Sequence, residues 1–172
     1  VIGDPCGDLP SARAEARAVA TLLRASALEP MVLEGDGATL EAVARQWHDL
    51  SVLHFAGHGR LAPDAPWEAR LDLARGQSLD LEFLLSRRPR ASLVVLSGCE
   101  TGATTRAPAD AIGLAEGFLA SGANQVLATT EKVADDGAAT FVERFYRLGG
   151  VTKPAEAFRA AALEAEAARA MA

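Results

Sequence analysis

The chain has 172 residues, a formal net charge of −6 at pH 7, and hydrophobic residues at 49% of its positions, few of them aromatic. This length predicts a single domain, residues 1–172, that buries a full core without disulfides or metals. The acidic balance argues against direct nucleic-acid binding and suits basic ligands or peptides. No run approaches the ~18 apolar residues that a membrane span needs. Two cysteines are too few for a disulfide framework, so we expect a reducing, cytoplasmic setting.

Helical and strand patterns alternate along the chain. The chain begins without Met inside an expected strand, so we expect it to be a fragment or C-terminal domain of a longer protein. Further strands are expected at 29–33, 52–56, 93–96 and 126–129. Helices are expected at 12–26, 40–47, 79–85, 109–121, 136–148 and 154–171. A small hairpin is expected near 69–73, and a polar loop at 101–108. This βαβα rhythm predicts an α/β fold with a mostly parallel sheet covered on both faces.

Three local details of these helices are also predicted. Ser11 is expected to cap the first helix and Thr39 the second, because each hydroxyl precedes a run of helical apolar spacing. The last helix is expected to pack through Phe158, Ala162 and Leu163.

Two expected strands end in a glycine-flanked reactive residue. The first motif is Ser51-Val-Leu-His-Phe-Ala-Gly-His-Gly59, and the second is Leu93-Val-Val-Leu-Ser-Gly-Cys-Glu-Thr-Gly102. In a parallel sheet the carboxyl ends of the strands meet at one edge, where α/β folds place their sites. A thiol and an imidazole that meet there are the minimum for cysteine-based nucleophilic catalysis.

The three histidines have different expected roles. His54 lies in the middle of a strand and is expected to be buried and hydrogen-bonded, whereas His48 is an exposed bystander. His58 lies between Gly57 and Gly59, which leave the backbone bare and free the Gly59 N–H to face the cleft. On a regular strand His54 and His58 are about 13 Å apart, so they do not share a metal ion. No metal or other cofactor is expected.

The two cysteines also differ. Cys99 comes after its apolar run has ended, in the polar surroundings that stabilise a thiolate; the alternative is a small buried hydrophobic side chain. Cys6 lies in a Pro-Cys-Gly turn and is expected to be incidental, with a Cys6–Cys99 disulfide as the alternative.

The motifs His54-Phe-Ala-Gly-His58-Gly59 and Leu96-Ser-Gly-Cys99-Glu-Thr-Gly102 resemble the signature of CHAT domains. These are caspase-like cysteine peptidase domains, often attached to TPR repeats and related to separase. The resemblance extends through Gly113-Leu-Ala-Glu-Gly-Phe-Leu-Ala-Ser-Gly-Ala123 to the last helix. One departure lies at residues 128–136, where such domains usually carry a Leu-Trp pair, because this segment contains no tryptophan.

The resemblance implies a caspase–haemoglobinase-like α/β/α sandwich and a His–Cys dyad without a required third acid. His58 would be the general base and acid, and Cys99 the attacking thiolate. The backbone N–H groups of Gly59 and Cys99 would bind the oxyanion. The implied substrate is a protein or peptide, and the implied regulator is a TPR or ligand-sensing module in the same or a partner chain, in bacterial signalling or defence.

Relatives that cut after Arg or Lys use acidic side chains in the pocket, which makes Asp135, Asp136 and Asp4 candidates here. Glu100 could line the pocket or orient its loop. The alternatives are structural, because Asp135 or Asp136 could cap a helix and Asp4 could hold its own turn. Two other functions stay open. One is a catalytically silent CHAT-like scaffold. The other is a flavodoxin-like binding domain, for which Gly3-Asp-Pro-Cys-Gly7 would be a poor phosphate-binding loop because Pro5 lacks a backbone N–H.

Overall fold

The computed structural model describes residues 1–60, 68–97, 110–128 and 135–170. Its central sheet consists of β1 (Ile2–Gly3), β2 (Leu33–Glu34), β3 (Val52–Ala56), β7 (Leu93–Ser97) and β8 (Val126–Ala128). The strand order is β2-β1-β3-β7-β8, and every neighbouring pair is parallel. All five residues of β7 are buried, as expected of a strand covered on both faces.

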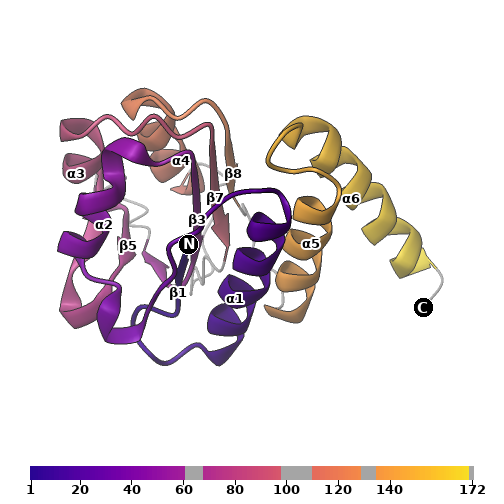
Figure 1. Cartoon of the computed structure of the whole chain (residues 1–172), viewed down its shortest axis with the longest axis horizontal. Helices are drawn as coiled ribbons and strands as arrows, with labels where there is room; N and C mark the ends of the chain where they lie inside the picture. The colour runs from indigo at the N-terminus through magenta and orange to yellow at the C-terminus, as the bar shows by residue number, and fades with distance from the viewer. Residues whose placement is uncertain (61–67, 98–109, 129–134, 171–172) are drawn as a thin grey trace.

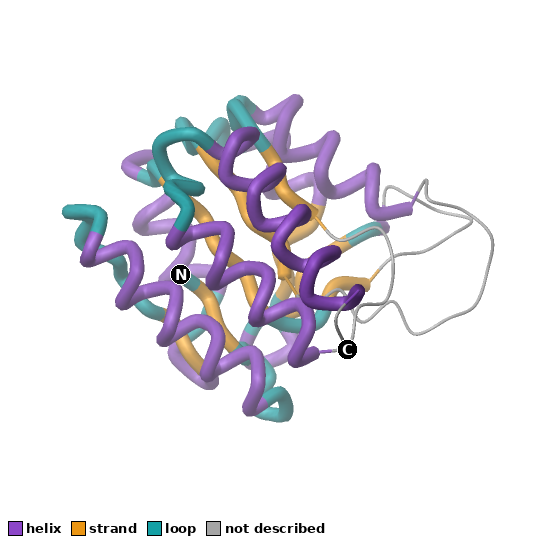
Figure 2. The backbone as a smooth tube through the Cα atoms, turned by 90° about the vertical axis from the view of Figure 1, so that its right-hand side faces the viewer, coloured by secondary structure: helices purple, strands orange, loops and turns teal. Residues whose placement is uncertain are grey.

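Helices cover both faces of this sheet (Figure 1). They are α1 (Pro10–Ala25), α2 (Leu40–Gln46), α3 (Leu81–Ser86), α4 (Asp110–Ser121), α5 (Asp135–Arg147) and α6 (Pro154–Ala170). Short 3-10 turns occur at Gly35–Gly37, Trp47–Asp49 and Ala74–Gly76. Helices α1 and α5 lie on one face with α6 outside α5, and α2, α3 and α4 lie on the other (Figures 1 and 2). The predicted α/β/α sandwich with a parallel sheet is confirmed. No described helix is both long and apolar enough to cross a bilayer.

Each helix layer has its own apolar core. On the α2–α4 side, the buried Trp47 ring packs edge-on against Phe83 at 5.0 Å between ring centroids and lies 6.3 Å from Phe118. On the α1–α5 side, Val95 of β7 packs with Phe145. Successive residues of the central strands therefore place their side chains in opposite helix layers, as the alternation of side chains along a strand requires.

A second, antiparallel sheet follows β3. It consists of β4 (Gly59–Arg60), β5 (Arg70–Asp72) and β6 (Ser78–Asp80). A hairpin does occur in this region, but the bounds predicted for it, 69–73, cover only one of its strands: the hairpin is formed by β5 and β6, and its turn lies at residues 73–77. The helix predicted at 79–85 begins too early, because residues 78–80 pair with β5 and Asp80 caps α3 by accepting from the Phe83 N–H at 2.8 Å.

Other element boundaries differ for physical reasons. The strand predicted at 29–33 is wrong: only Leu33–Glu34 pairs, because β1 offers just two residues as partners. The predicted Ser11 cap is also wrong. Helix α1 starts at Pro10, whose fixed φ suits the first helical position, and Leu9 precedes it. The Thr39 cap is confirmed, since its hydroxyl accepts from the Ala42 N–H at 3.2 Å.

The packing predicted for the last helix is wrong in register. Phe158 is 46% exposed and Leu163 61% exposed, whereas Ala157 and Ala161 are buried. Small side chains therefore allow α6 to lie close to α5, and Phe158 packs at the rim against Phe141 at 5.6 Å between ring centroids.

The strand order creates a topological switch point between β1 and β3. From β1 the chain builds outward to β2, and then returns to place β3 on the other side of β1. In open α/β sheets the crevice at such a point, beyond the carboxyl ends of the strands, is where ligands bind. Here the segments that leave this point are residues 4–9 after β1 and Gly57-His58 after β3.

Candidate active site

The two motif strands lie side by side in matched register. Ala56 at the end of β3 pairs with Ser97 at the end of β7, and the Gly57 N–H donates to the Ser97 carbonyl at 3.3 Å. His58 comes two residues after Ala56, and Cys99 comes two residues after Ser97. Cys99 lies outside the described residues.

His58 is held from both its backbone and its side chain. Its carbonyl accepts from the Asp72 N–H at 2.9 Å, which joins the turn to the second sheet. Its side chain is 20% exposed, and its Nε2 lies 3.1 Å from each carboxylate oxygen of Asp8. This imidazole therefore lies at the switch point, partly open and next to a carboxylate.

Sequence reasoning missed Asp8. An aspartate in a polar loop carries no periodic signal, and 50 positions separate it from His58. The signal available was topological, because residues 4–9 leave β1 at the same edge of the sheet as His58 leaves β3.

The direction of the Gly59 N–H follows from the ladder of the second sheet. Because His58 accepts from Asp72, these two residues form a hydrogen-bonded pair of the antiparallel ladder. Their neighbours Gly59 and Leu71 form the next pair, which is non-hydrogen-bonded. The Gly59 N–H is therefore directed away from β5.

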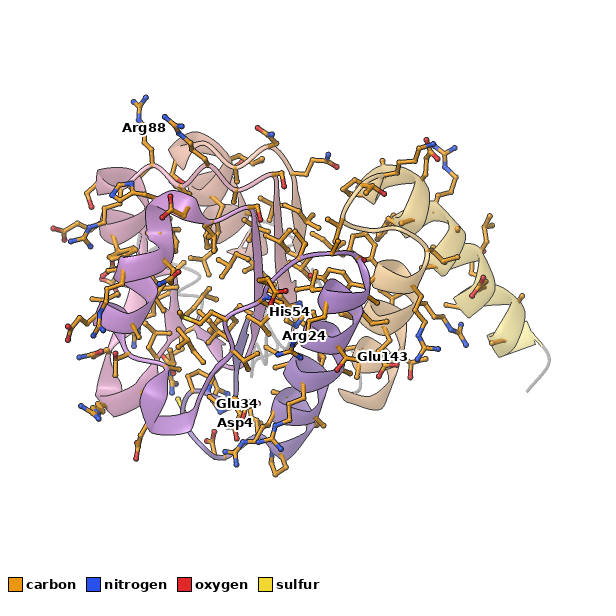
Figure 3. All side chains as sticks on the ribbon, in the orientation of Figure 1. Asp4, Arg24, Glu34, His54, Arg88 and Glu143 are labelled. Atoms are coloured by element: carbon orange, nitrogen blue, oxygen red, sulfur yellow. The ribbon has the colours of Figure 1, made fainter. Side chains whose placement is uncertain are left out.

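Asp4 has a structural role. Its side chain is 1% exposed; one oxygen accepts from the Leu9 N–H at 2.9 Å, and the other accepts from Arg13 at 2.6 Å. Asp4 also adopts a left-handed φ of 47°. Figure 3 shows Asp4 beside Glu34 at the lower edge of the sheet. This carboxylate holds the turn after β1, which is one of the two roles its position in the sequence allowed.

The other acidic candidates are less fully defined. Asp135 and Asp136 form the start of α5, at the end of the segment that follows β8. Their side chains lie outside the part of the chain that the structure describes, as does Glu100.

The prediction that His54 is buried and hydrogen-bonded is confirmed. It is fully buried next to α1 (Figure 3), and its Nδ1 lies 3.4 Å from the Tyr146 hydroxyl of α5. Its Nε2 lies 3.2 Å from a Glu15 carboxylate oxygen of α1, without the alignment of a hydrogen bond. Burial first, and then the Glu15 charge, raise the pKa of Tyr146 well above its ordinary value. His54 thus ties β3 to two helices, whereas His48 is exposed as predicted.

Cys6 is the described cysteine, and it is exposed on the loop after β1. Partial burial of the thiol raises its pKa, and the negative charges of Asp72 and Asp8 raise it further. The Cys6 thiol is therefore held protonated at neutral pH, which makes it a poor nucleophile.

One hollow in the described surface lies away from the candidate site residues. A cavity of about 150 Å³ opens at the amino ends of β1 and β3, lined by residues that include Val1, Met31 and Val52. None of the candidate site residues lines it. Among the residues described, no group of three or more His, Cys, Asp or Glu side chains is arranged to hold a metal ion.

Fold and site together define an α/β protein of the caspase-like kind, with a parallel sheet between two helix layers and a histidine at the carboxyl end of a central strand. The chain belongs to the CHAT family, because the family model for the CHAT domain matches residues 1–170. The resemblance predicted from the motifs is thereby confirmed. CHAT is a caspase-like, peptidase-related family. No curated protein matches the chain.

Proposed function

We propose that this chain is a cysteine endopeptidase that cleaves protein substrates with a His58–Cys99 dyad. The observation that carries the proposal is the matched register of β3 and β7, in which Ala56 pairs with Ser97 and each reactive residue follows two positions later. Because the two parallel strands end level with each other and the Gly57 N–H bonds the Ser97 carbonyl beyond the pairing, this register supports a shared edge of the sheet for the two reactive residues.

The chemistry follows from the two side chains. The imidazole of His58 takes the thiol proton of Cys99, and the thiolate attacks the scissile carbonyl carbon. The imidazolium then gives the proton to the leaving amine, and water hydrolyses the acyl-enzyme. The N–H groups of Gly59 and Cys99 would receive the oxyanion; each such donor is worth roughly 3–4 kcal/mol in the transition state. The orientation of the Gly59 N–H away from β5 supports this role.

For the substrate, we propose a basic residue before the scissile bond. Asp135 and Asp136 begin α5, directly after the segment that follows β8, and are the favoured pocket acids. Glu100 is a further candidate next to the nucleophile. Asp4 is a weaker one, since both of its oxygens already accept bonds from within the chain.

Regulation is proposed to come from an attached module, such as TPR repeats or a ligand sensor, in the same or a partner chain. Loops at the carboxyl edge of the sheet are suited to being ordered by such a partner before catalysis. Activity of this domain alone, equal to that of the full-length protein, would make such a regulator unnecessary.

The deciding experiment compares Cys99→Ala, His58→Ala and Cys6→Ser in the full-length, activated protein. We expect the first two variants to lose cleavage while keeping their circular dichroism, and the third to keep both, because Cys6 is held protonated. Iodoacetamide labelling at neutral pH in the Cys6→Ser background should modify Cys99 quickly. Cleavage that survives Cys99→Ala, or a thiol at Cys99 that reacts slowly, would instead favour a catalytically silent scaffold.

A further inference from the structure

The carboxylate of Asp8 lies against the imidazole of His58 and contacts it in a defined way. Both carboxylate oxygens are 3.1 Å from the same ring nitrogen, Nε2. Asp8 comes from the loop after β1, and His58 from the turn after β3, so the contact bridges the two sides of the topological switch point.

The loop that carries Asp8 is closed at both ends. The Asp4 N–H donates to the Ala56 carbonyl at 2.9 Å, which extends the β1–β3 pairing by one bond. The buried Asp4 carboxylate then accepts from the Leu9 N–H at 2.9 Å, so that residues 4 and 9 form the base of the loop. Asp8 is the residue directly before this closure.

The middle of the loop also packs on the turn that carries His58. A Cβ added to Gly57 would lie 2.9 Å from Cδ of Pro5, so Pro5 rests directly on the Gly57 backbone. The Gly7 N–H closes a tight turn by donating to the Asp4 carbonyl at 3.2 Å. Both partners of the Asp8–His58 contact thus stand on backbone fixed by other bonds.

We propose that Asp8 is a positioning residue for His58: its carboxylate accepts the Nε2–H and orients the ring so that Nδ1 is the nitrogen that exchanges the proton with Cys99. The hydrogen bond made by one ring nitrogen of a neutral histidine decides which of the two nitrogens carries the proton. A nitrogen that faces an acceptor keeps its proton, and the other nitrogen is then unprotonated. An ionised carboxylate can only accept a hydrogen bond, so its contact with Nε2 selects the form of neutral His58 that carries the proton on Nε2. The working unit is then Asp8–His58–Cys99.

The inference rests on the proposed peptidase function, and the proton balance is unchanged. The thiol proton of Cys99 moves to Nδ1 while the S–C bond forms and the carbonyl electrons move to oxygen. When the C–N bond breaks, Nδ1–H gives that proton to the amine. The Nε2–H stays on His58 and donates to Asp8 throughout, and Asp8 exchanges no proton, as in other histidine-centred catalytic groups oriented by a carboxylate.

The exposure of Asp8 limits the size of the effect. Its side chain is 62% exposed, so solvent and salt screen the interaction and it contributes little to stability. We therefore expect loss of Asp8 to lower kcat by about tenfold, less than the roughly 10²–10⁴-fold of a complete general base. The melting temperature should stay unchanged.

The test uses Asp8→Ala, Asp8→Asn and Asp8→Glu in the full-length, activated protein, with a fluorogenic peptide that carries Arg before the scissile bond. Asp36→Asn is the matched control, because Asp36 is another exposed aspartate in the segment that follows a strand of the same sheet. We expect Asp8→Ala and Asp8→Asn to lower kcat about tenfold with KM changed less than twofold. Asp8→Glu should recover part of the loss, and Asp36→Asn should match wild type.

A second readout does not depend on cleavage. Long-range proton–nitrogen NMR spectra of the same protein, labelled with nitrogen-15 in its histidine rings, report which nitrogen of neutral His58 carries the proton; His58→Gln assigns the signals. We expect the Nε2–H form in wild type and a mixture in Asp8→Ala.

The failure of this inference is distinguishable from failure of the proposed function. Unchanged kcat in Asp8→Ala, or a wild-type His58 that carries its proton on Nδ1, overturns the role of Asp8 even if the protein is a peptidase. Absence of cleavage by wild type would count against the peptidase, and the NMR spectra would then decide alone whether Asp8 orients His58.

Discussion

Gly3 of β1 lies directly against Ala16 of α1: a Cβ added to Gly3 would overlap the Cβ of Ala16 and would lie 3.3 Å from the Ala12 carbonyl. Ala16 is fully buried. The absence of a side chain on Gly3 therefore sets how closely the first helix approaches the sheet, directly before the loop that carries Asp8.

Gly3→Ala is expected to destabilise the fold by about 1–3 kcal/mol, because overpacking a rigid contact displaces the helix. Ala16→Gly alone should cost roughly 1 kcal/mol through helix propensity. In the double variant the two costs should be less than additive, since removing one Cβ makes room for the other. Urea denaturation measures all three.

The control for that cycle is Gly37→Ala, because a Cβ on Gly37 would meet nothing within 4 Å. Its stability should lie within about 0.5 kcal/mol of wild type. Strict additivity of Gly3→Ala and Ala16→Gly would show that the two residues do not limit the approach of α1.

A second prediction concerns alkaline pH, where Tyr146 reports on the core. It is the single tyrosine of the chain, and burial raises its pKa above the ordinary value of 10.0. The unfolded state then loses this proton before the folded state does. The contribution of neutral Tyr146 to stability is therefore fully present below about pH 10 and declines as the pH rises further.

The measurement is a spectrophotometric titration followed in parallel by circular dichroism. We expect the phenolate band to appear together with loss of helical signal, and to appear near pH 10 in denaturant. In Tyr146→Phe, stability should fall less steeply above pH 10, at the expense of about 1 kcal/mol at neutral pH from the lost contact with His54. Ionisation of Tyr146 near pH 10 in a fully folded protein would contradict its burial.

The sequence predicted the central strands well because their signal is local. The runs at 52–56 and 93–96 are mostly apolar, contain β-branched residues and have a glycine within two positions of their ends, and β3 and β7 occur where expected. Edge strands carry no such signal: β2 is two residues long, and its limits depend on β1 rather than on its own side chains. Likewise, α6 packs through Ala157 and Ala161, whose small size matters only once α5 is in place.

A residue of the candidate site could be predicted where the local sequence at the end of one strand was enough to indicate it. His58 was found because glycines flank it directly after a strand. Asp8 was missed because two tertiary features bring it to His58. One is the pairing of β1 with β3, and the other is the hydrogen bond from the Leu9 N–H to the Asp4 carboxylate, which closes the loop that carries Asp8. Strand order, which sets the switch point, is a tertiary property that periodicity along the chain does not encode.

Substrate preference supplies a third prediction. Peptides with Arg or Lys before the scissile bond should be cut best, and Asp135→Asn or Asp136→Asn should lower kcat/KM for the Arg peptide roughly thirtyfold. That corresponds to about 2 kcal/mol for a truncated buried charge pair. Glu100→Gln should be less harmful if Glu100 only orients its loop. A fluorogenic panel measures each variant.

The control for the pocket is Glu143→Gln, which removes a charge from the same helix α5, where Glu143 pairs with Arg147 at 3.3 Å on the surface. It should leave the preference unchanged, because exposed pairs contribute little. Equal or better turnover of peptides with Asp or small apolar residues before the cut would reject an acidic pocket altogether.

The last prediction separates the two roles of Asp4. If its buried carboxylate only closes the loop, Asp4→Ala should cost about 2–4 kcal/mol, because the Leu9 N–H and the partly exposed Arg13 lose their partner. Asp4→Asn should cost less, about 1–3 kcal/mol, since asparagine keeps an acceptor for Leu9 and tolerates the left-handed φ of 47°.

In both Asp4 variants, kcat should fall because the loop that carries Asp8 is less firmly held. The preference for Arg over other residues should stay constant, because a residue that only closes the loop does not contact the substrate. Urea midpoints and the peptide panel together measure this, with Asp36→Asn as the exposed control that should change neither. A variant of Asp4 with native stability and a lost Arg preference would make Asp4 a pocket residue. The bond between Arg13 and Asp4 would then have to open when substrate binds, since the Asp4 side chain is only 1% exposed in the structure.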